Sequence, residues 1–114
     1  MDPLVDIIIR RGNNAPAVAW KFEAEDGSLL PVAGRKFVLT VKWSGGLLRK
    51  DTSTADGFSL DAATSTAIWS PSLSESRMIP LGRVSRYEIE LREGDLQLSI
   101  VAGSVTGVGG LNDD

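Results

Sequence analysis

The sequence predicts an all-β protein: a single small antiparallel Ig-like β-sandwich of about seven to eight strands, with at most one short helical turn. Short segments alternate apolar and polar residues, which is the pattern of strands with one buried face. Turn residues recur about every ten residues, and no long helical period interrupts them. A chain of 114 residues holds one core, so we expect one domain over residues 1–114 with a frayed tail at 109–114.

The first half of the chain predicts four strands and one irregular crossing. The crossing is Ser28–Gly34, where Pro31 excludes a central strand because it cannot donate a ladder hydrogen bond. The strands are Val5–Arg11, Ala17–Glu25, Lys36–Trp43 and a short return strand at Leu47–Asp51.

The middle of the chain predicts two short strands and the helical turn. Phe58–Asp61 and Thr66–Ser70 are the strands. Pro71–Leu81 suits one or two helical turns, since Ser72 or Ser74 can cap the first turn and the proline at 80 stops its propagation.

A long hairpin over Ser85–Gly107 organises the rest of the chain. Apolar and charged residues alternate through Tyr87–Leu91, and Gly94 permits the tight turn that follows. The return strand switches parity near Ile100–Val101. We therefore expect a β-bulge there, of the kind that can turn a strand from one sheet towards the other.

Composition argues against several function classes. The chain has no histidine and no cysteine, which removes a Ser–His–Asp arrangement, a disulfide framework and a thiolate metal site. The net charge is −3 and the basic residues are scattered, so we expect no nucleic-acid partner. We also expect no catalytic residues, metal or cofactor, no signal peptide and no membrane span.

The three tryptophans are the most informative large side chains. Trp20 and Trp43 lie in phase with apolar neighbours, which favours the core. Trp69 is out of phase with Ile68, so we expect it to be partly exposed. The candidate ligand or partner contacts are Trp69, Leu47 and Leu48, together with an apolar stretch at 79–81.

The order of segments along nearly the whole chain carries a family resemblance. The segments are the Gly12 turn before Trp20 and Phe22, Asp26-Gly27 before Leu29–Pro31, the strand Phe37–Trp43, Asp56-Gly57-Phe58, Leu73–Arg83, the alternation Tyr87–Leu91 with its Gly94-Asp95 turn, and Ile100–Val105. This pattern resembles the small Ig-like domains of tailed-phage virions, as found at the N-terminus of baseplate upper proteins and in similar prophage tail proteins.

The resemblance implies a connector or attachment module of a tail, baseplate or fibre. The resemblance implies that its partners are other virion proteins, and it also allows a homo-oligomer. Such a protein is made in the bacterial cytoplasm and resides in the virion tail after assembly. Baseplate upper proteins continue into a fibre-like region, whereas this sequence stops at Asp114, so a stand-alone tail accessory component is the nearer analogue.

Two other functions compete with this hypothesis. A stand-alone carbohydrate-binding module would stack sugars on an exposed tryptophan, for which Trp69 is the candidate. A small hydrolytic enzyme would need two carboxylates brought together from distant strands. The acidic residues show no spacing that favours it.

Overall fold

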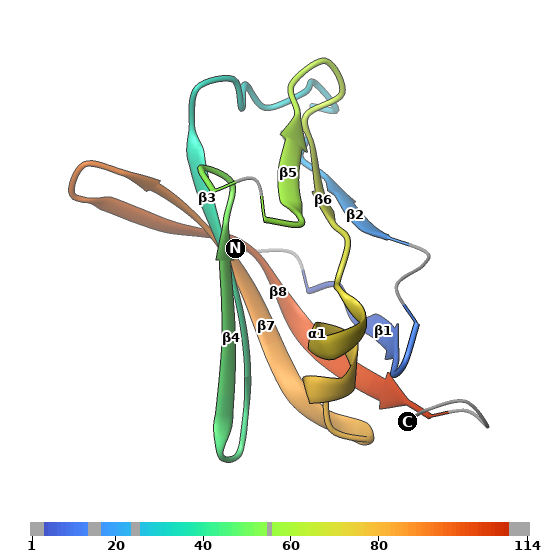
Figure 1. Cartoon of the computed structure of the whole chain (residues 1–114). Coiled ribbons are helices and arrows are strands. Elements are labelled where there is room, and N and C mark those ends of the chain that lie inside the picture. The colour runs from blue at the N-terminus through green and yellow to red at the C-terminus, as the bar shows by residue number, and fades with distance from the viewer. Residues whose placement is uncertain (1–3, 14–16, 24–25, 55, 110–114) are drawn as a thin grey trace.

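The computed structural model describes residues 4–13, 17–23, 26–54 and 56–109, and it is a two-layer β-sandwich (Figure 1). Apart from Gly109, the tail expected to fray lies outside the described residues, as does Glu25 at the end of the second predicted strand. The elements are β1 (Ile7–Arg10), β2 (Val18–Lys21), β3 (Lys36–Trp43), β4 (Gly46–Asp51), β5 (Phe58–Asp61), β6 (Thr66–Trp69), α1 (Leu73–Met78), β7 (Gly82–Glu93) and β8 (Leu96–Val108).

Two sheets form the layers of the sandwich. The larger has the strand order β1-β8-β7-β3-β4, and the smaller has the order β2-β6-β5. This division matches immunoglobulin-type sandwiches, in which B, E and D share one sheet and G, F and C the other. The predicted antiparallel pairing holds for every neighbouring pair except β1 and β8, which run parallel.

The β7–β8 hairpin forms the centre of the larger sheet, and its tip projects beyond the sandwich (Figure 1). Gly94 turns the chain with a φ of 55°, as the sequence predicts. The bulge is also confirmed: Ile89 pairs with Val101 and Glu90 with Ser99, so Ile100 is the extra residue. It does not carry β8 to the other sheet, however, because β8 pairs with β7 on both sides of the bulge.

Helix α1 lies between β6 and β7 and is held by a capping box. The Ser72 side chain accepts from the backbone N–H of Glu75, whose carboxylate accepts from the Ser72 N–H. Behind the helix, Ile79 is fully buried while Leu81 is exposed, so the apolar stretch predicted at 79–81 is not one exposed surface. Within the described residues, no helix has the length and apolar character to cross a membrane.

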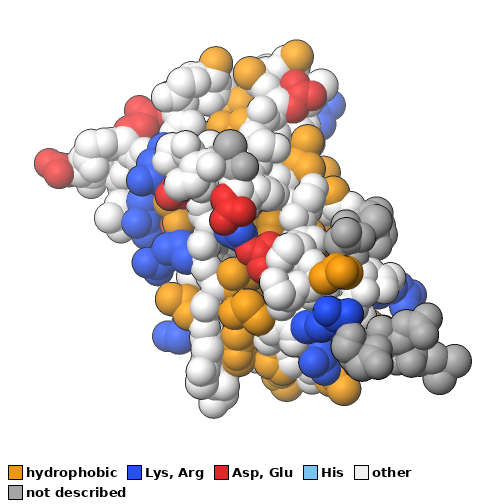
Figure 2. All heavy atoms as spheres, in the orientation of Figure 1, with side chains coloured by type: hydrophobic (Ala, Val, Ile, Leu, Met, Phe, Trp, Pro, Cys, Tyr) orange, Lys and Arg blue, Asp and Glu red, His pale blue; other side chains and the backbone are white. Residues whose placement is uncertain are grey.

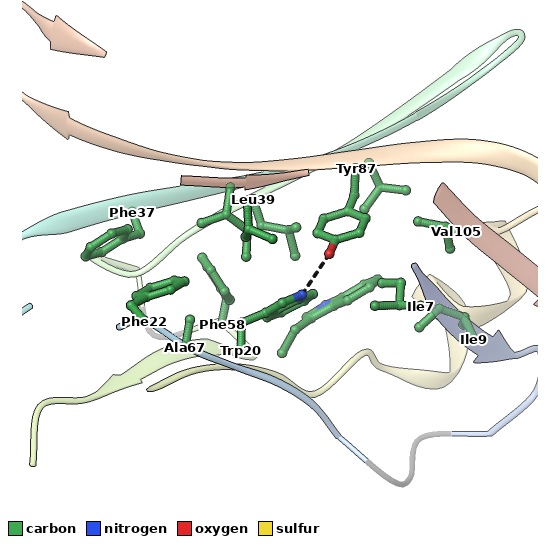
Figure 3. Close-up of a cluster of buried hydrophobic side chains, with 14 of the residues drawn as sticks. Ile7, Ile9, Trp20, Phe22, Phe37, Leu39, Phe58, Ala67, Tyr87 and Val105 are labelled. Atoms are coloured by element: carbon green, nitrogen blue, oxygen red, sulfur yellow. Dashed lines mark hydrogen bonds between the residues drawn. The ribbon is translucent and has the colours of Figure 1, made fainter. Parts of the chain in front are cut away.

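One hydrogen-bond chain joins the two sheets across the core. Trp20 of β2 donates its indole N–H to the Tyr87 hydroxyl of β7 at 2.9 Å (Figure 3). Tyr87 donates in turn to the backbone carbonyl of Val5 at 2.5 Å. Around them, side chains from both sheets interdigitate, including Phe22 stacked on Phe37. Both buried polar tips are therefore satisfied while their rings fill the core.

Two glycines let chain segments lie directly on β8. A Cβ at Gly103 would overlap the carbonyl oxygen of Val5, and one at Gly107 would overlap that of Pro80. The segment before β1 and the segment after α1 can therefore pack against β8 only while these positions lack side chains.

Tyr87 generates a prediction about pH. Burial raises the pKa of Tyr87, the hydrogen bond from Trp20 offsets part of that rise, and the charge of Asp6 adds to it. The chain has one tyrosine, so tyrosinate absorbance reports this group directly. We expect the native protein to titrate above the ordinary value of 10.0, and the denatured chain to return to it.

The same shift has a consequence for stability. Since the folded pKa is raised, the neutral phenol stabilises the fold fully below pH 10.0, and this contribution is lost as pH rises through the folded pKa. Tyr87→Phe should therefore show a shallower loss of unfolding free energy above that pH, measured by denaturant titration. A native midpoint at or below 10.0 would contradict the buried network.

Candidate functional site

The sandwich is closed on one side and open on the other. On the closed side the edge strands β4 and β5 lie against each other. On the other side β1 and β2 are the edges, and within the described part of the chain each has a hydrogen-bonded strand on one side only. We call β1, β2 and residues 96–101 of β8 the open side.

A first groove runs between β1 and β2. Its volume is about 490 Å³, and mostly apolar residues line it. Ile8 of β1 is 64% exposed beside it. The lining residues are Ile7–Arg10, Asn13, Ala17–Ala19 and Pro71.

A second groove continues the first towards the hairpin tip, and Ala19 lines both. Its volume is about 520 Å³. One wall is Trp20 to Glu23 with Leu30, and the other is Val5 with residues 98–101 of β8. The apolar inner face of β8 is thus left partly uncovered where β2 ends.

The edge of β8 beside the second groove has no strand next to it among the described residues. β1 pairs with β8 only from Val105 to Val108. In the described part of the preceding segment, the last pairing is the isolated parallel bridge of Leu4 with Ala102, where the Val5 N–H donates to the Ala102 carbonyl at 2.8 Å. Beyond Ala102, residues 96–101 pair with β7 alone. Because antiparallel hydrogen bonds alternate along a strand, part of the N–H and C=O groups of this stretch point outward from the sheet.

A charged contact holds the segment before β1 on β8, close to the free edge. The Asp6 carboxylate accepts from the backbone N–H of Ser104 at 3.0 Å and pairs with Arg83 at 2.9 Å. The hydrogen bonds from Ser104 lower the pKa of Asp6, and Arg83 lowers it further. Asp6 therefore remains a carboxylate and holds the segment before β1 on β8.

A second charged cluster joins β4, the loop before β5, and α1. Lys50 is 9% exposed, and its ammonium contacts the Glu75 carboxylate and lies 2.9 Å from that of Asp56. Burial lowers the pKa of Lys50, but the two carboxylates outweigh it and the net shift is upward. Lys50 is therefore a protonated cross-link and not a neutral amine nucleophile.

The outer face of the larger sheet carries charges of both signs. Lys42 of β3 lies directly opposite Arg86 of β7, with Arg49, Glu88 and Glu90 around a shallow hollow. Figure 2 shows basic side chains gathered on the left of the view, with acidic groups nearby. In the part of the chain that the structure describes, no group of three acidic side chains is placed to hold a metal ion.

Trp69 corrects the sequence interpretation. It is 0% exposed, because β6 is the middle strand of the smaller sheet and turns Ala67 and Trp69 into the core. The phase of this strand is set by Trp69 and not by Ile68, which faces the other way. The prediction that Trp69 is partly exposed is wrong, and its indole cannot stack on a ligand.

The other two tryptophans are also covered, Trp20 fully and Trp43 in part. Trp20 is buried, as expected. Trp43 is half-buried, and its indole lies so close over Gly46 that a Cβ there would overlap it. The carbohydrate-binding alternative therefore loses the exposed tryptophan on which it rested.

The two leucine candidates lie far from the grooves in the sheet order. Leu47 is 49% exposed on β4, and Leu48 packs partly against the core. β4 is the opposite edge of the larger sheet from β1, so neither leucine joins the open side.

Sequence reasoning missed Ile8 and Leu98, although the alternation through 96–100 indicates that one face of this segment is apolar.

Comparison with known proteins identifies no family. No protein-family model matches the sequence, and no curated protein matches it.

The Lys50 cluster generates a prediction that separates charge from helix capping. Glu75→Gln retains an acceptor at the capping-box position but leaves buried Lys50 without its main counter-charge. We expect a loss of about 1–3 kcal/mol in unfolding free energy. Asp56→Asn is the matched control, since Asp56 is largely exposed and its pairing should contribute about 0–1 kcal/mol. Equal losses in chemical denaturation would contradict this division of roles.

Proposed function

We propose that this chain is a non-enzymatic structural module of a phage or prophage virion tail, which assembles with other tail proteins through the open side. The assembly role rests on two features found together: strand edges with no neighbouring strand among the described residues, and two adjoining apolar grooves. A strand edge offers backbone donors and acceptors, and an apolar groove beside it accepts side chains.

The tail context is supported by the order of segments along the sequence and by the strand order of the sandwich. The Gly12 turn, the Asp26-Gly27 turn and the hairpin at 85–107 follow one another as in Ig-like tail domains. The division of strands between the two sheets is the one that Ig-like domains have. In such a module the rigid core positions edges and loops for neighbouring proteins, and no chemistry is required of it.

The proposal favours the open side over the β4 edge as the assembly surface. The open side brings together two grooves and exposed apolar side chains such as Ile8 and Leu98. Leu47 is exposed to the same degree as Leu98, but it lines neither of the two grooves of the open side.

The test is incorporation into particles. Tails purified from the phage or prophage that encodes the chain should contain it in a fixed ratio to other tail proteins, measured by quantitative mass spectrometry. Ile8→Lys should reduce incorporation because a charge at the groove rim would have to be desolvated on assembly. Leu47→Lys is the matched control and should incorporate as the unaltered chain does.

Absence of the unaltered chain from purified particles would overturn the tail role. Equal incorporation of the Ile8→Lys and unaltered chains would instead remove the first groove from the assembly surface.

A further inference from the structure

We infer that two copies of this chain pair through the free edge of β8, antiparallel and centred on Leu98. This inference rests on the proposed assembly role, since it specifies one partner of the open side. Its components are the exposed backbone of residues 96–101, the polarity pattern of that segment and the second groove.

The backbone of the free edge can form hydrogen bonds with an added strand. Its outward N–H and C=O groups form a row that an extended segment can satisfy in full. The Val5 N–H already occupies the Ala102 carbonyl, so the row ends there. Among the described residues, the available edge is therefore 96–101, which is long enough for a five-residue strand.

The segment Leu96-Gln97-Leu98-Ser99-Ile100 is a palindrome in polarity. An antiparallel pair centred on Leu98 places Leu98 opposite its own copy, Leu96 opposite Ile100, and Gln97 opposite Ser99. Every apolar side chain then meets an apolar one on the same face of the joined sheet. A shift by one residue would put the apolar side chains of the two copies on opposite faces, which sets the register.

The second groove can accept the apolar side chains that a second β8 would bring. Leu98 is 48% exposed and Leu96 is 49% exposed, on the same face as the core residue Leu91, to which Leu98 is paired. Ile100 packs partly against the core, and Phe22 and Leu30 also line the groove. A second β8 would lay its own Leu98 and Ile100 over this groove, and the two-fold relation fills both grooves at once.

Cysteine trapping tests the pairing in the full chain, because the unaltered protein has no cysteine. Leu98→Cys places two thiols opposite each other across the two-fold axis, at about 4.5–5.5 Å between Cβ atoms. Mild oxidation should therefore convert most of this variant to a disulfide-linked dimer on non-reducing gels. Under reducing conditions the variant should keep the far-ultraviolet circular dichroism of the unaltered chain.

Leu96→Cys is the register control, since Leu96 is as exposed as Leu98. In the inferred pair its two copies are four residues out of register, roughly 13 Å apart along the strands. That separation exceeds the Cα limit of roughly 7 Å for a disulfide. Leu47→Cys controls for non-specific oxidation at an exposed leucine of another edge. Both controls should yield only traces of dimer.

Light scattering on a concentration series provides the second measurement. The mass of the unaltered chain should rise towards that of two chains as concentration increases. Leu98→Lys should abolish the rise and Leu47→Lys should not, because the first puts a charge in the joined edge and the second lies outside it.

Two results would overturn the pairing: a mass of one chain throughout the series, or trapping of Leu98→Cys no greater than that of Leu96→Cys. Neither touches the tail role, which incorporation into particles decides. Conversely, a trapped dimer of a chain absent from particles would confirm the pairing and refute the tail role.

Discussion

The hydrogen-bond chain from Trp20 through Tyr87 to Val5 is the interaction on which the rest of the arrangement depends. It crosses from the smaller sheet to the larger one and ends on the backbone of the segment that leads into β1. Burying an indole and a phenol brings large apolar area into the core, and satisfying both polar tips avoids the cost of an unpaired buried donor. The same chain places Val5 on β8 and so determines where the free edge begins.

Strand β8 combines three roles through small changes in its side chains. Gly103 and Gly107 admit two backbone segments directly against it, while Val101 and Val105 face the core. Beyond the bulge at Ile100 the strand leaves the sandwich with its apolar face partly uncovered. One half of β8 is therefore covered by its own chain, whereas the other half has no strand beside its outer edge among the described residues. In the proposed assembly, one part of this strand serves the fold and the other part serves the contact with a partner.

A buried ion pair links β4 to α1, which no sheet hydrogen bonds connect. Lys50 points inward from β4 and meets Glu75, which also caps the first turn of α1. A six-residue helix is too short to be stable alone, so this contact and the burial of Ile79 hold it in place. The position of α1 in turn sets the path by which the chain enters β7.

The sequence by itself determined the strands, the turn at Gly94, the capped helix and the bulge, because alternation, turn residues and caps act over a few neighbouring residues. The tertiary structure alone decided which face of a four-residue strand is buried: Ala67 and Trp69 face inward because β6 lies between β2 and β5. It also decided that β1 stops short along β8. Which edge stays uncovered depends on pairings between residues about a hundred positions apart, such as Ile7 with Val105, and no local pattern encodes that.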